Sequence, residues 1–536
     1  MPVAEPSFSN THLDVLTGRQ LDLSVPSSHG HIVVFAYEAW GHARPLCNLA
    51  ARLVQSRNII VTFFTTPAFY DRVMSELLRN FDADGLGLDR IRVITLIHTG
   101  MHSLDNTVLN DSFAQAFDKL AEGDPVQCVH TGVTHEPVSP PKAVIIDFFG
   151  LPLLQAVRRL SGVGEPIKVF VWFAGAAAVV FRLCAPERLG GIGNLRAKSE
   201  EEAIRKHVRV EQAAGDIALG NDGAVVRIPG LPAIYDYEIE PQKILGGRAL
   251  TGAMCLAAYE VFETCDGIIL ASPESYEPET TAALRQWMAG TSRPVYCAGP
   301  MIAQGTHADS VEKGQSESIA EVDDFLESTM KHNGKRSLLY ISFGTVYWSM
   351  EPKKIWTFLD VVLELRIPFI MSHSSRWATV PEEVADKVSR SGNGLLVRYS
   401  PQQHILNHPA TGWFLTHGGH NSIIEAICAG VPMICWPFSF DQPLNAIHLT
   451  ENLNVAYEIF QGRTGPGLKP IHRLGKAPEG TLDSVKEEAR EILLNAFGED
   501  GIRKRENVQA LRQRTLDARS KRGTSTHDIH VFLDTL

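Results

Sequence analysis

Two polar side chains early in the chain follow apolar stretches, in positions from which they could transfer protons. His42 belongs to the stretch Trp40-Gly-His42-Ala-Arg-Pro45, which comes after a strand expected over residues 31–36. Pro45 suits the first turn of a helix expected over residues 45–55, because proline lacks the amide hydrogen that this turn leaves unpaired. The dipole of that helix disfavours an imidazolium just ahead of it, and a neutral imidazole can accept a proton as a general base does. A histidine that merely packs at a strand end is the commoner alternative.

Asp147 ends the apolar run Lys-Ala-Val-Ile-Ile-Asp, which predicts a strand over residues 143–146. A helix is expected directly after it, over residues 151–159. A lone aspartate in that position is more often a helix N-cap than a catalyst. The local pattern alone therefore assigns neither His42 nor Asp147 to chemistry.

A second polar cluster lies in the segment 399–446. Residues 412–416 predict a buried strand, His417-Gly-Gly-His420 a tight turn, and Asn421-Ser422 the opening of a helix. The glycines let the backbone approach a ligand closely, and a helix N-terminus offers free amides and partial positive charge to a phosphate. The imidazole of the first histidine can add a further donor to a pyrophosphate oxygen.

The same helix start has a purely structural interpretation. Ser422-Ile-Ile-Glu425 matches a capping box, in which both side chains only satisfy unpaired amides. The local pattern alone favours this interpretation. Gly430-Val-Pro432 ends the helix, and residues 433–436 predict the next strand. Asp441 and Gln442 follow at the carboxyl end of that strand, where ligands bind in open α/β sheets.

The segment 399–446 resembles the donor-binding motif of the family-1 UDP-glycosyltransferases, in the form seen in plant and fungal enzymes that act on small molecules. The shared pattern is Pro-Gln, a strand, Thr-His-Gly-Gly, Asn-Ser-x-x-Glu, Gly-Val-Pro and Asp-Gln-x-x-Asn-Ala, in that order and spacing. Weaker resemblance extends over most of the chain. It implies the GT-B fold, in which two Rossmann-like α/β domains face a cleft, with the acceptor on the first and the donor on the second.

The resemblance also implies which residues bind a UDP-sugar donor. They are Tyr399, Ser400 and Gln402 for uracil, Glu425 for the ribose, Gly344, Thr345, His417, Asn421 and Ser422 for the phosphates, and Asp441 and Gln442 for the sugar. Tyr399 stands where plant members carry a tryptophan, and its aromatic face still permits stacking on the base. His420 replaces a tryptophan beside the sugar, and a neutral or protonated ring there could reach a sugar hydroxyl or, in UDP-glucuronate, a carboxylate.

For the first half, the resemblance implies that His42 removes the acceptor proton. Asp147 would orient it and stabilise the imidazolium, as the triad aspartate does in hydrolases. It implies one displacement that inverts the anomeric configuration, so that an α-linked donor gives a β-glycoside. No metal or other cofactor is implied; the UDP-sugar, with UDP-glucose favoured, is a co-substrate. Aromatic residues near the strand ends could line an apolar acceptor pocket or belong to the core: Trp40, Phe148, Phe149 and Phe173.

Short β-branched or aromatic runs alternate with helical patterns along the chain, which predicts an α/β fold. Further strands are expected over residues 59–65, 91–96, 168–172, 337–342, 369–372 and 394–398, and further helices over residues 354–365 and 422–429 and through the charged region 482–518. The expected domains are an acceptor-binding domain over residues 1–300, a linker over 301–320, a UDP-sugar-binding domain over 321–500, and a C-terminal helix over 501–536 that returns to the first domain. The polar stretch 305–324 is expected to be a linker or an exposed loop.

Composition excludes several other classes of protein. The 536 residues are enough for two large domains, and the net charge of −11 without a long Lys/Arg block disfavours a nucleic-acid or anionic-membrane surface. The eight cysteines contain no CxxC pair, which is typical of reduced thiols in the cytoplasm. We see no secretory signal, and the most apolar run, residues 169–181, is too short for a transmembrane segment. The expected partners are a UDP-sugar and a small lipophilic hydroxylated acceptor.

Three alternatives remain at this stage. A dinucleotide-dependent oxidoreductase would need a GxGxxG turn after a strand, and none follows residues 31–36 or 337–342. A metalloenzyme could use His404 and His408 or His417 and His420, but no carboxylate or cysteine cluster joins either pair. The third is a protein of the same fold that binds a nucleotide sugar without catalysing transfer.

Overall fold

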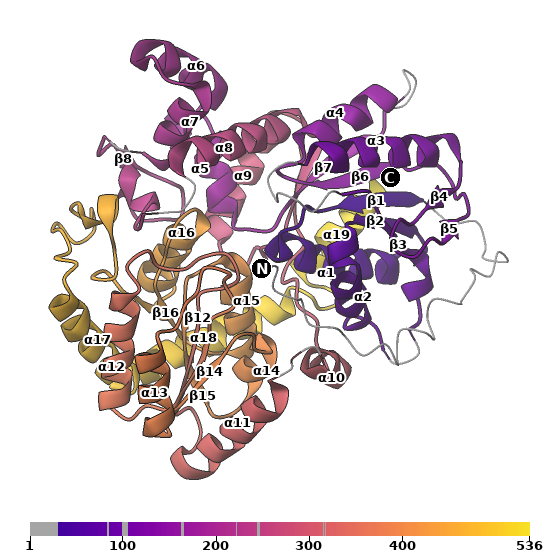
Figure 1. Ribbon diagram of the computed structural model, residues 1–536. Helices are drawn as coiled ribbons and strands as arrows, with labels where there is room; N and C mark the ends of the chain where they lie inside the picture. The colour runs from indigo at the N-terminus through magenta and orange to yellow at the C-terminus, as the bar shows by residue number, and fades with distance from the viewer. Residues whose placement is uncertain are drawn as a thin grey trace.

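The computed structural model describes residues 30–82, 85–98, 106–161, 166–220, 222–243, 247–314, 316 and 318–536. Figure 1 shows two halves, each built around a parallel sheet covered by helices. Two buried apolar clusters lie in each half, on either side of its sheet. The predicted α/β class is therefore confirmed.

The first sheet has seven parallel strands in the order β11-β10-β7-β6-β1-β2-β3. Their bounds are β1 His31–Phe35, β2 Ile60–Thr65, β3 Ile91–Thr95, β6 Ala143–Asp147, β7 Lys168–Phe173, β10 Gly267–Leu270 and β11 Val295–Cys297. Every residue of β1 and β6 is buried, as expected for central strands with helices on both faces. The strand order reverses between β1 and β6, so residues at the carboxyl ends of these two strands meet where α/β sheets bind ligands.

The second sheet repeats this plan with six parallel strands in the order β14-β13-β12-β15-β16-β17. Their bounds are β12 Leu338–Ser342, β13 Phe369–Ser372, β14 Gly394–Val397, β15 Thr411–Thr416, β16 Met433–Cys435 and β17 Ala456–Glu458. The order reverses between β12 and β15, which is the equivalent ligand-binding position. Two short hairpins lie outside the sheets: β4 (Val126–Gln127) with β5 (Thr134–His135), and β8 (Val225–Val226) with β9 (Ile234–Tyr235).

Helices cover both sheets. Those of the first half are α1 Trp40–Ser56, α2 Tyr70–Leu78, α3 Thr107–Glu122, α4 Leu151–Leu160, α5 Ala177–Cys184, α6 Leu195–Lys206, α7 Val210–Leu219, α8 Gly247–Thr264 and α9 Pro278–Ala289. Those that follow are α10 Thr306–Gly314, α11 Ile319–Asn333, α12 Lys353–Glu364, α13 Glu382–Ser391, α14 Gln402–Asn407, α15 His420–Ala429, α16 Asp441–Ile447, α17 Leu482–Ala496, α18 Glu499–Asp517 and α19 Thr524–Asp534. No helix among the described residues is long and apolar enough to cross a membrane.

All ten predicted strands are present, each end within one residue of the prediction. Strands β11 and β17 were not predicted, because runs of three residues carry little pattern. Two helix starts differ from the expectation: α1 begins at Trp40, and α15 begins at His420. Both differences matter for the site, because they move His42 and Ser422 inside the first turn of a helix.

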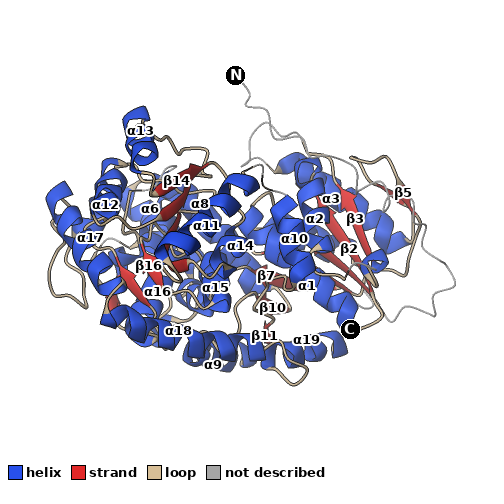
Figure 2. Cartoon of the chain, turned by 90° about the horizontal axis from the view of Figure 1, so that it is seen from below, coloured by secondary structure: helices blue, strands red, loops and turns tan. Residues whose placement is uncertain are grey.

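The linker and the tail also differ from the prediction. The stretch 305–324 is not a loop: it holds α10 and the beginning of α11, and α10 packs against α2 of the first half and α14 of the second. The tail is two helices where one was expected. Figure 2 shows them along one side of the molecule: α18 packs on α15 of the second half, and only α19 reaches β11 and α1 of the first.

Candidate active site between the two halves

His42 and Asp147 form a hydrogen bond at the point where the strand order of the first sheet reverses. Nδ1 of His42 lies 2.7 Å from Oδ2 of Asp147, and the aspartate side chain is fully buried. The other carboxyl oxygen, Oδ1, accepts a 3.0 Å hydrogen bond from the backbone amide of Phe149. The N-cap of α4 is Gly150, without a side-chain cap. Asp147 therefore does not cap α4, and the structural alternative for this residue is wrong.

Both the backbone and the ring of His42 are fixed by neighbouring residues. The backbone carbonyl accepts a 3.0 Å hydrogen bond from Nε1 of Trp172. Phe148 and Phe149 lie beside the imidazole, with ring centroids 5.1 and 5.8 Å from it. The side chain keeps 22% of its surface exposed. Since Nδ1 faces the carboxylate, the opposite nitrogen, Nε2, is the one available to a bound molecule.

The charge state of His42 differs from the sequence expectation. His42 lies within the first turn of α1, and not ahead of it. Burial lowers its pKa, but the charge and hydrogen bond of Asp147, together with the charge of Asp441, outweigh burial and raise the pKa above 6.5. The two carboxylates therefore raise the proton affinity of His42 by more than burial lowers it.

The second half presents a helix N-terminus opposite this pair. The N-cap of α15 is Gly419, with no side-chain cap. Ser422 lies in the first turn and Glu425 one turn later, so these two residues do not form a capping box. The side-chain amide of Asn421 donates a 2.5 Å hydrogen bond to the carbonyl of Gly41 in α1. The beginnings of α1 and α15 are therefore in direct contact.

His417 follows β15 and fits tightly between two glycines. A Cβ atom on Gly344 would lie 2.9 Å from Cε1 of this ring, and one on Gly419 would lie 2.4 Å from Nε2. Gly344 also has φ +74°, which favours glycine. Burial lowers the pKa of His417 to about 4. The ring is therefore neutral near pH 7 and can offer one N–H donor.

A set of polar side chains from β12, α14 and α15 adjoins this helix start. The hydroxyls of Tyr340 and Ser400 lie 2.9 Å apart. The side-chain amide of Gln402 donates to Oε2 of Glu425 at 2.6 Å and to the hydroxyl of Ser422 at 3.3 Å. Tyr399 lines the same cavity and keeps 40% of its surface exposed, which leaves its ring accessible to a flat ligand.

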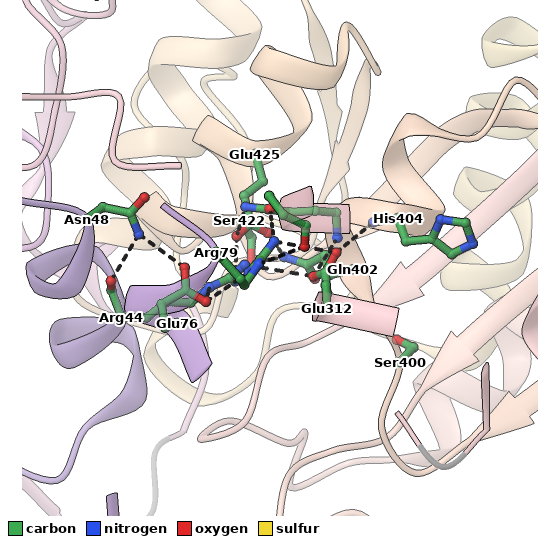
Figure 3. A network of polar contacts seen from close by, with 12 residues as sticks. Arg44, Asn48, Glu76, Arg79, Glu312, Ser400, Gln402, His404, Ser422 and Glu425 are labelled. Atoms are coloured by element: carbon green, nitrogen blue, oxygen red, sulfur yellow. Dashed lines mark hydrogen bonds and ion pairs between the residues drawn. The ribbon is translucent and has the colours of Figure 1, made fainter. Parts of the chain in front are cut away.

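Glu425 is also bound to the first half, through an arginine to which the sequence assigned no role. Arg44 of α1 donates from one guanidinium nitrogen to Oε1 of Glu425 at 2.6 Å. Figure 3 shows the network around this pair, which includes Glu76, Arg79 and Glu312. Arg79 pairs with Glu76 at 2.8 Å, and Arg44 lies 3.5 Å from Glu76 and 3.8 Å from Glu312. The expected ribose contact is thus already part of a buried charge network between the halves.

Asp441 and Gln442 begin α16, next to the start of α15. Oδ2 of Asp441 accepts hydrogen bonds from the backbone amide of His420 at 2.9 Å and from the side chain of Asn445 at 3.0 Å. Burial raises the pKa of Asp441 to about 6. Oε1 of Gln442 accepts from the backbone amide of Phe438 at 2.8 Å. The glutamine oxygen is therefore occupied, and its amide hydrogens are left for a ligand.

His420 is 4% exposed, and neither ring nitrogen has a hydrogen-bond partner in the described part of the chain. Burial lowers its pKa to about 3. The protonated ring considered from the sequence is therefore wrong. A neutral His420 can bond to a hydroxyl but cannot form an ion pair with a sugar carboxylate.

The predicted site residues come together in one cavity of about 490 Å³ between the halves. All of them line this cavity except Asp147, which is hydrogen-bonded to the His42 ring and does not itself reach the cavity. Phe148, Phe149 and Phe173 form one wall. The ring centroid of Phe148 lies 4.0 Å from that of Phe149 and 4.8 Å from that of Phe173. Phe173 is 5% exposed and also belongs to the buried core, so it is both a core residue and part of the cavity wall.

Sequence reasoning missed several polar contributors to the cavity, and three of them come from different parts of the chain. Tyr340 lies within an apolar strand, Arg44 within the first turns of α1, and Glu312 in the stretch expected to be a loop. Only the arginine gave a local signal, as the single charge inside the Gly-His-Ala-Arg-Pro motif.

His404 and His408, one of the two histidine pairs considered as metal ligands, have other partners. His404 is hydrogen-bonded to Asp323 at 2.6 Å, and His408 lies 3.4 Å from Glu327. No group of three or more His, Cys, Asp or Glu side chains within the described ranges is arranged to hold a metal ion.

Comparison with known proteins shows similarity to glycosyltransferases. Residues 312–460 match the family described as UDP-glucoronosyl and UDP-glucosyl transferase. The UDP-glycosyltransferase eriJ of Hericium erinaceus is 29% identical, and the match covers 87% of this chain and 90% of that protein. UDP-glycosyltransferase 73E1 of Stevia rebaudiana is 26% identical over 95% of this chain and 96% of its own.

Solved structures share the fold. Phytolacca americana UGT2, complexed with UDP-2-fluoro-glucose and pterostilbene, has a TM-score of 0.65 at 20% identity and covers 95% of this chain and 100% of its own. Medicago truncatula UGT71G1, complexed with UDP-glucose, has a TM-score of 0.66 at 18% identity and covers 94% of this chain and 98% of its own. These likenesses confirm the GT-B fold, with two Rossmann-like domains. The chain is therefore a glycosyltransferase that is similar, over most of its length, to the family-1 UDP-glycosyltransferases.

Proposed function

We propose that this glycosyltransferase moves glucose from UDP-glucose to a hydroxyl of a small lipophilic acceptor, with inversion to a β-glucoside. The observation that carries the proposal is the 2.7 Å His42–Asp147 pair, which shares one cavity with the start of α15. A base and a phosphate-binding helix start on opposite sides of a cavity are what a single displacement requires.

The first step is removal of the acceptor proton. With its Nδ1 hydrogen bonded to Asp147, His42 presents an unprotonated Nε2 to the acceptor hydroxyl. The oxygen attacks the anomeric carbon as the proton moves to Nε2, and Asp147 stabilises the imidazolium that forms. Phe148 and Phe149 keep water from the ring and offer an apolar surface to the acceptor.

The second requirement is stabilisation of the departing UDP. The start of α15 directs backbone amides and partial positive charge toward the cavity, because Gly419 supplies no side-chain cap. A neutral His417 adds one N–H donor, and no metal is needed in this scheme. Expected contacts of Tyr399, Ser400 and Gln402 with uracil, and of Gly344 and Thr345 with the phosphates, are supported by their positions on the cavity wall.

Glucose is proposed as the sugar because the hydroxyl-binding groups are neutral or negative. Gln442 offers amide hydrogens, Asp441 offers a carboxylate and His420 is uncharged. A glucuronate carboxylate would meet Asp441 without a cation from His420. Both structures described above contain UDP-glucose or a fluorinated analogue, which agrees with this choice.

We also propose a cytoplasmic location and a phenolic or similarly lipophilic acceptor. All eight cysteines are free thiols, which suits a reducing compartment. The acceptor wall is aromatic, and the Phytolacca enzyme holds the phenolic compound pterostilbene.

The test is to incubate the protein with UDP-glucose and a panel of phenols and lipophilic alcohols. We expect UDP release that requires the acceptor hydroxyl and is absent with the matched methyl ethers, and a product whose anomeric proton has the coupling of a β-glucoside. An α-glucoside would contradict inversion. Tight UDP-glucose binding without transfer to any acceptor would favour the alternative, a nucleotide-sugar-binding protein of the same fold.

A further inference from the structure

On the acceptor side of the cavity, the residues that the structure describes include one cation in a wall that is otherwise apolar. Arg182 lines the cavity together with Val179, Leu183 and Ile192 and with residues of α8. It lies on α5, about 7.5 Å along the axis from the first residue of that helix, given a rise of about 1.5 Å per residue. α5 follows β7, whose last residue, Phe173, belongs to the aromatic wall beside His42.

The guanidinium of Arg182 has no counter-ion within the described parts of the chain. Its Nε is buried without a hydrogen-bond partner, and no ion pair joins it to a carboxylate. Burial lowers its pKa from 12.5 to about 10, and only the more distant charge of Asp236 opposes this change. Asp236 itself accepts hydrogen bonds from the backbone amides of Asp222, Gly223 and Tyr237.

Arg182 is half-buried, and its Nε is shielded from water without a partner. An arginine shielded in this way is usually paired with an anion. A purely apolar acceptor would leave the charge unpaired and would remove still more water from it. A carboxylate would match the planar guanidinium with two parallel hydrogen bonds. The apolar wall between His42 and Arg182 suits the body of such a molecule.

We propose that the acceptor is an amphipathic hydroxy acid, whose hydroxyl lies at His42 and whose carboxylate lies at Arg182, with an apolar body between them. This inference rests on the proposed function and adds the chemical class of the acceptor. The carboxylate is a binding group; the sugar is transferred to the hydroxyl at the opposite end.

The experiment compares acids with their own neutral derivatives. The probes are 4-hydroxyphenyl alkanoic acids of increasing chain length and their methyl esters, with UDP-glucose saturating and kcat/KM as the measured quantity. At the best chain length we expect the acid to exceed its ester at least tenfold. Arg182→Gln should lower kcat/KM for the acid by about 10- to 100-fold, with the ester changed less than about threefold.

Two further variants separate charge recognition from structure. Arg188→Gln removes one positive charge from an exposed residue shortly after α5 and should leave the preference for acids unchanged. Arg182→Lys keeps the positive charge but cannot form two parallel hydrogen bonds to a carboxylate, and should retain part of the preference for acids over esters. If Arg182→Gln does not fold, the ratio of acid to ester in the parent and in Arg182→Lys still decides the question.

The inference is overturned if the parent treats acid and ester alike, or if Arg182→Gln lowers both equally. Calorimetric binding of the corresponding phenylalkanoates, which lack the hydroxyl, in the presence of UDP gives a readout without catalysis. Binding of the acid that weakens in Arg182→Gln, without transfer to any acceptor, would support the anion site while contradicting the proposed function. Transfer to neutral acceptors only, without binding of the acid, would support the proposed function and contradict the anion site.

Discussion

The hydrogen bond between His42 and Asp147 makes a quantitative prediction for Asp147→Asn. The substitution keeps the size of the side chain and removes a charge-assisted hydrogen bond of 2.7 Å. Such a bond contributes about 1.5–3 kcal/mol, and one pKa unit corresponds to about 1.36 kcal/mol. The pKa of His42, which the carboxylate raises, should therefore fall by about one to two units in the variant.

The variant should also place the proton on the wrong nitrogen. The amide of Phe149 donates to Oδ1 of Asp147, and an asparagine oxygen would keep this contact. Its NH₂ group would then face Nδ1 of His42, so that Nδ1 accepts and Nε2 carries the hydrogen. An Nε2–H imidazole cannot remove the acceptor proton. We therefore expect the plateau of kcat/KM to fall by about 10²–10⁴-fold.

The assay is UDP release between pH 5 and 9 with an aliphatic alcohol, whose hydroxyl does not titrate in this range. His42 must be neutral to act as a base, so activity falls as the pH drops through its pKa. In Asp147→Asn this acid limb should move to lower pH while the plateau drops. Asp111→Asn, which removes an exposed carboxylate of α3, should change neither. An acid limb that stays in place, or a plateau within a few-fold of the parent, would refute the reasoning.

Four shorter predictions follow. His42→Ala should lower kcat/KM by about 10²–10⁴-fold with UDP affinity nearly unchanged; activity within a few-fold of the parent would remove His42 from the mechanism. Excess EDTA should leave activity intact, and a loss restored by Mg²⁺ or Mn²⁺ would contradict the account of the leaving group. UDP-glucose should give a higher kcat/KM than UDP-glucuronate, in the parent and in His420→Trp; a preference for UDP-glucuronate in the parent would falsify the neutral-ring argument. Arg44→Ala leaves Glu425 without its cation and should lower the free energy of unfolding by about 3–5 kcal/mol. Arg390→Ala, which removes an exposed ion pair with Asp386, should lower it by about 0–1 kcal/mol; equal effects would mean that the network contributes little.

Much of the fold could be predicted because each half repeats one local rule. A buried run of β-branched residues followed by an amphipathic helix fixes the strand positions within a residue, as for β6 (Ala143–Asp147). The failures lie where the pattern is short or the partner is distant. The three residues of β11 (Val295–Cys297) carry little periodicity. α10 has the polar composition of a loop, and its helix is stabilised by Glu312, which accepts hydrogen bonds from backbone amides of α14.

The site was predictable in its membership and less so in its electrostatics. A motif places His417 and His420 beside a helix start, but their proton affinities depend on burial. Burial lowers the two pKa values to about 4 and about 3. The pKa of His42 is raised instead, because the carboxylate of Asp147, 105 positions away in the chain, lies at hydrogen-bond distance. The sequence therefore predicts which residues form the site, whereas their burial and charged neighbours depend on the fold.

Arg44 and Glu425 extend this argument from charge to ligand binding. The sequence offered two interpretations of Glu425, a helix cap and a ribose contact. Neither includes Arg44, which lies 381 positions earlier in the chain. Oε1 of Glu425 already accepts from Arg44 and from Gln403, and Oε2 accepts from Gln402. A ribose hydroxyl that donates to this carboxylate must therefore share or displace one of these donors. Because Arg44 belongs to α1, two residues after His42, binding of the nucleotide at Glu425 would act directly on the helix that carries the proposed base.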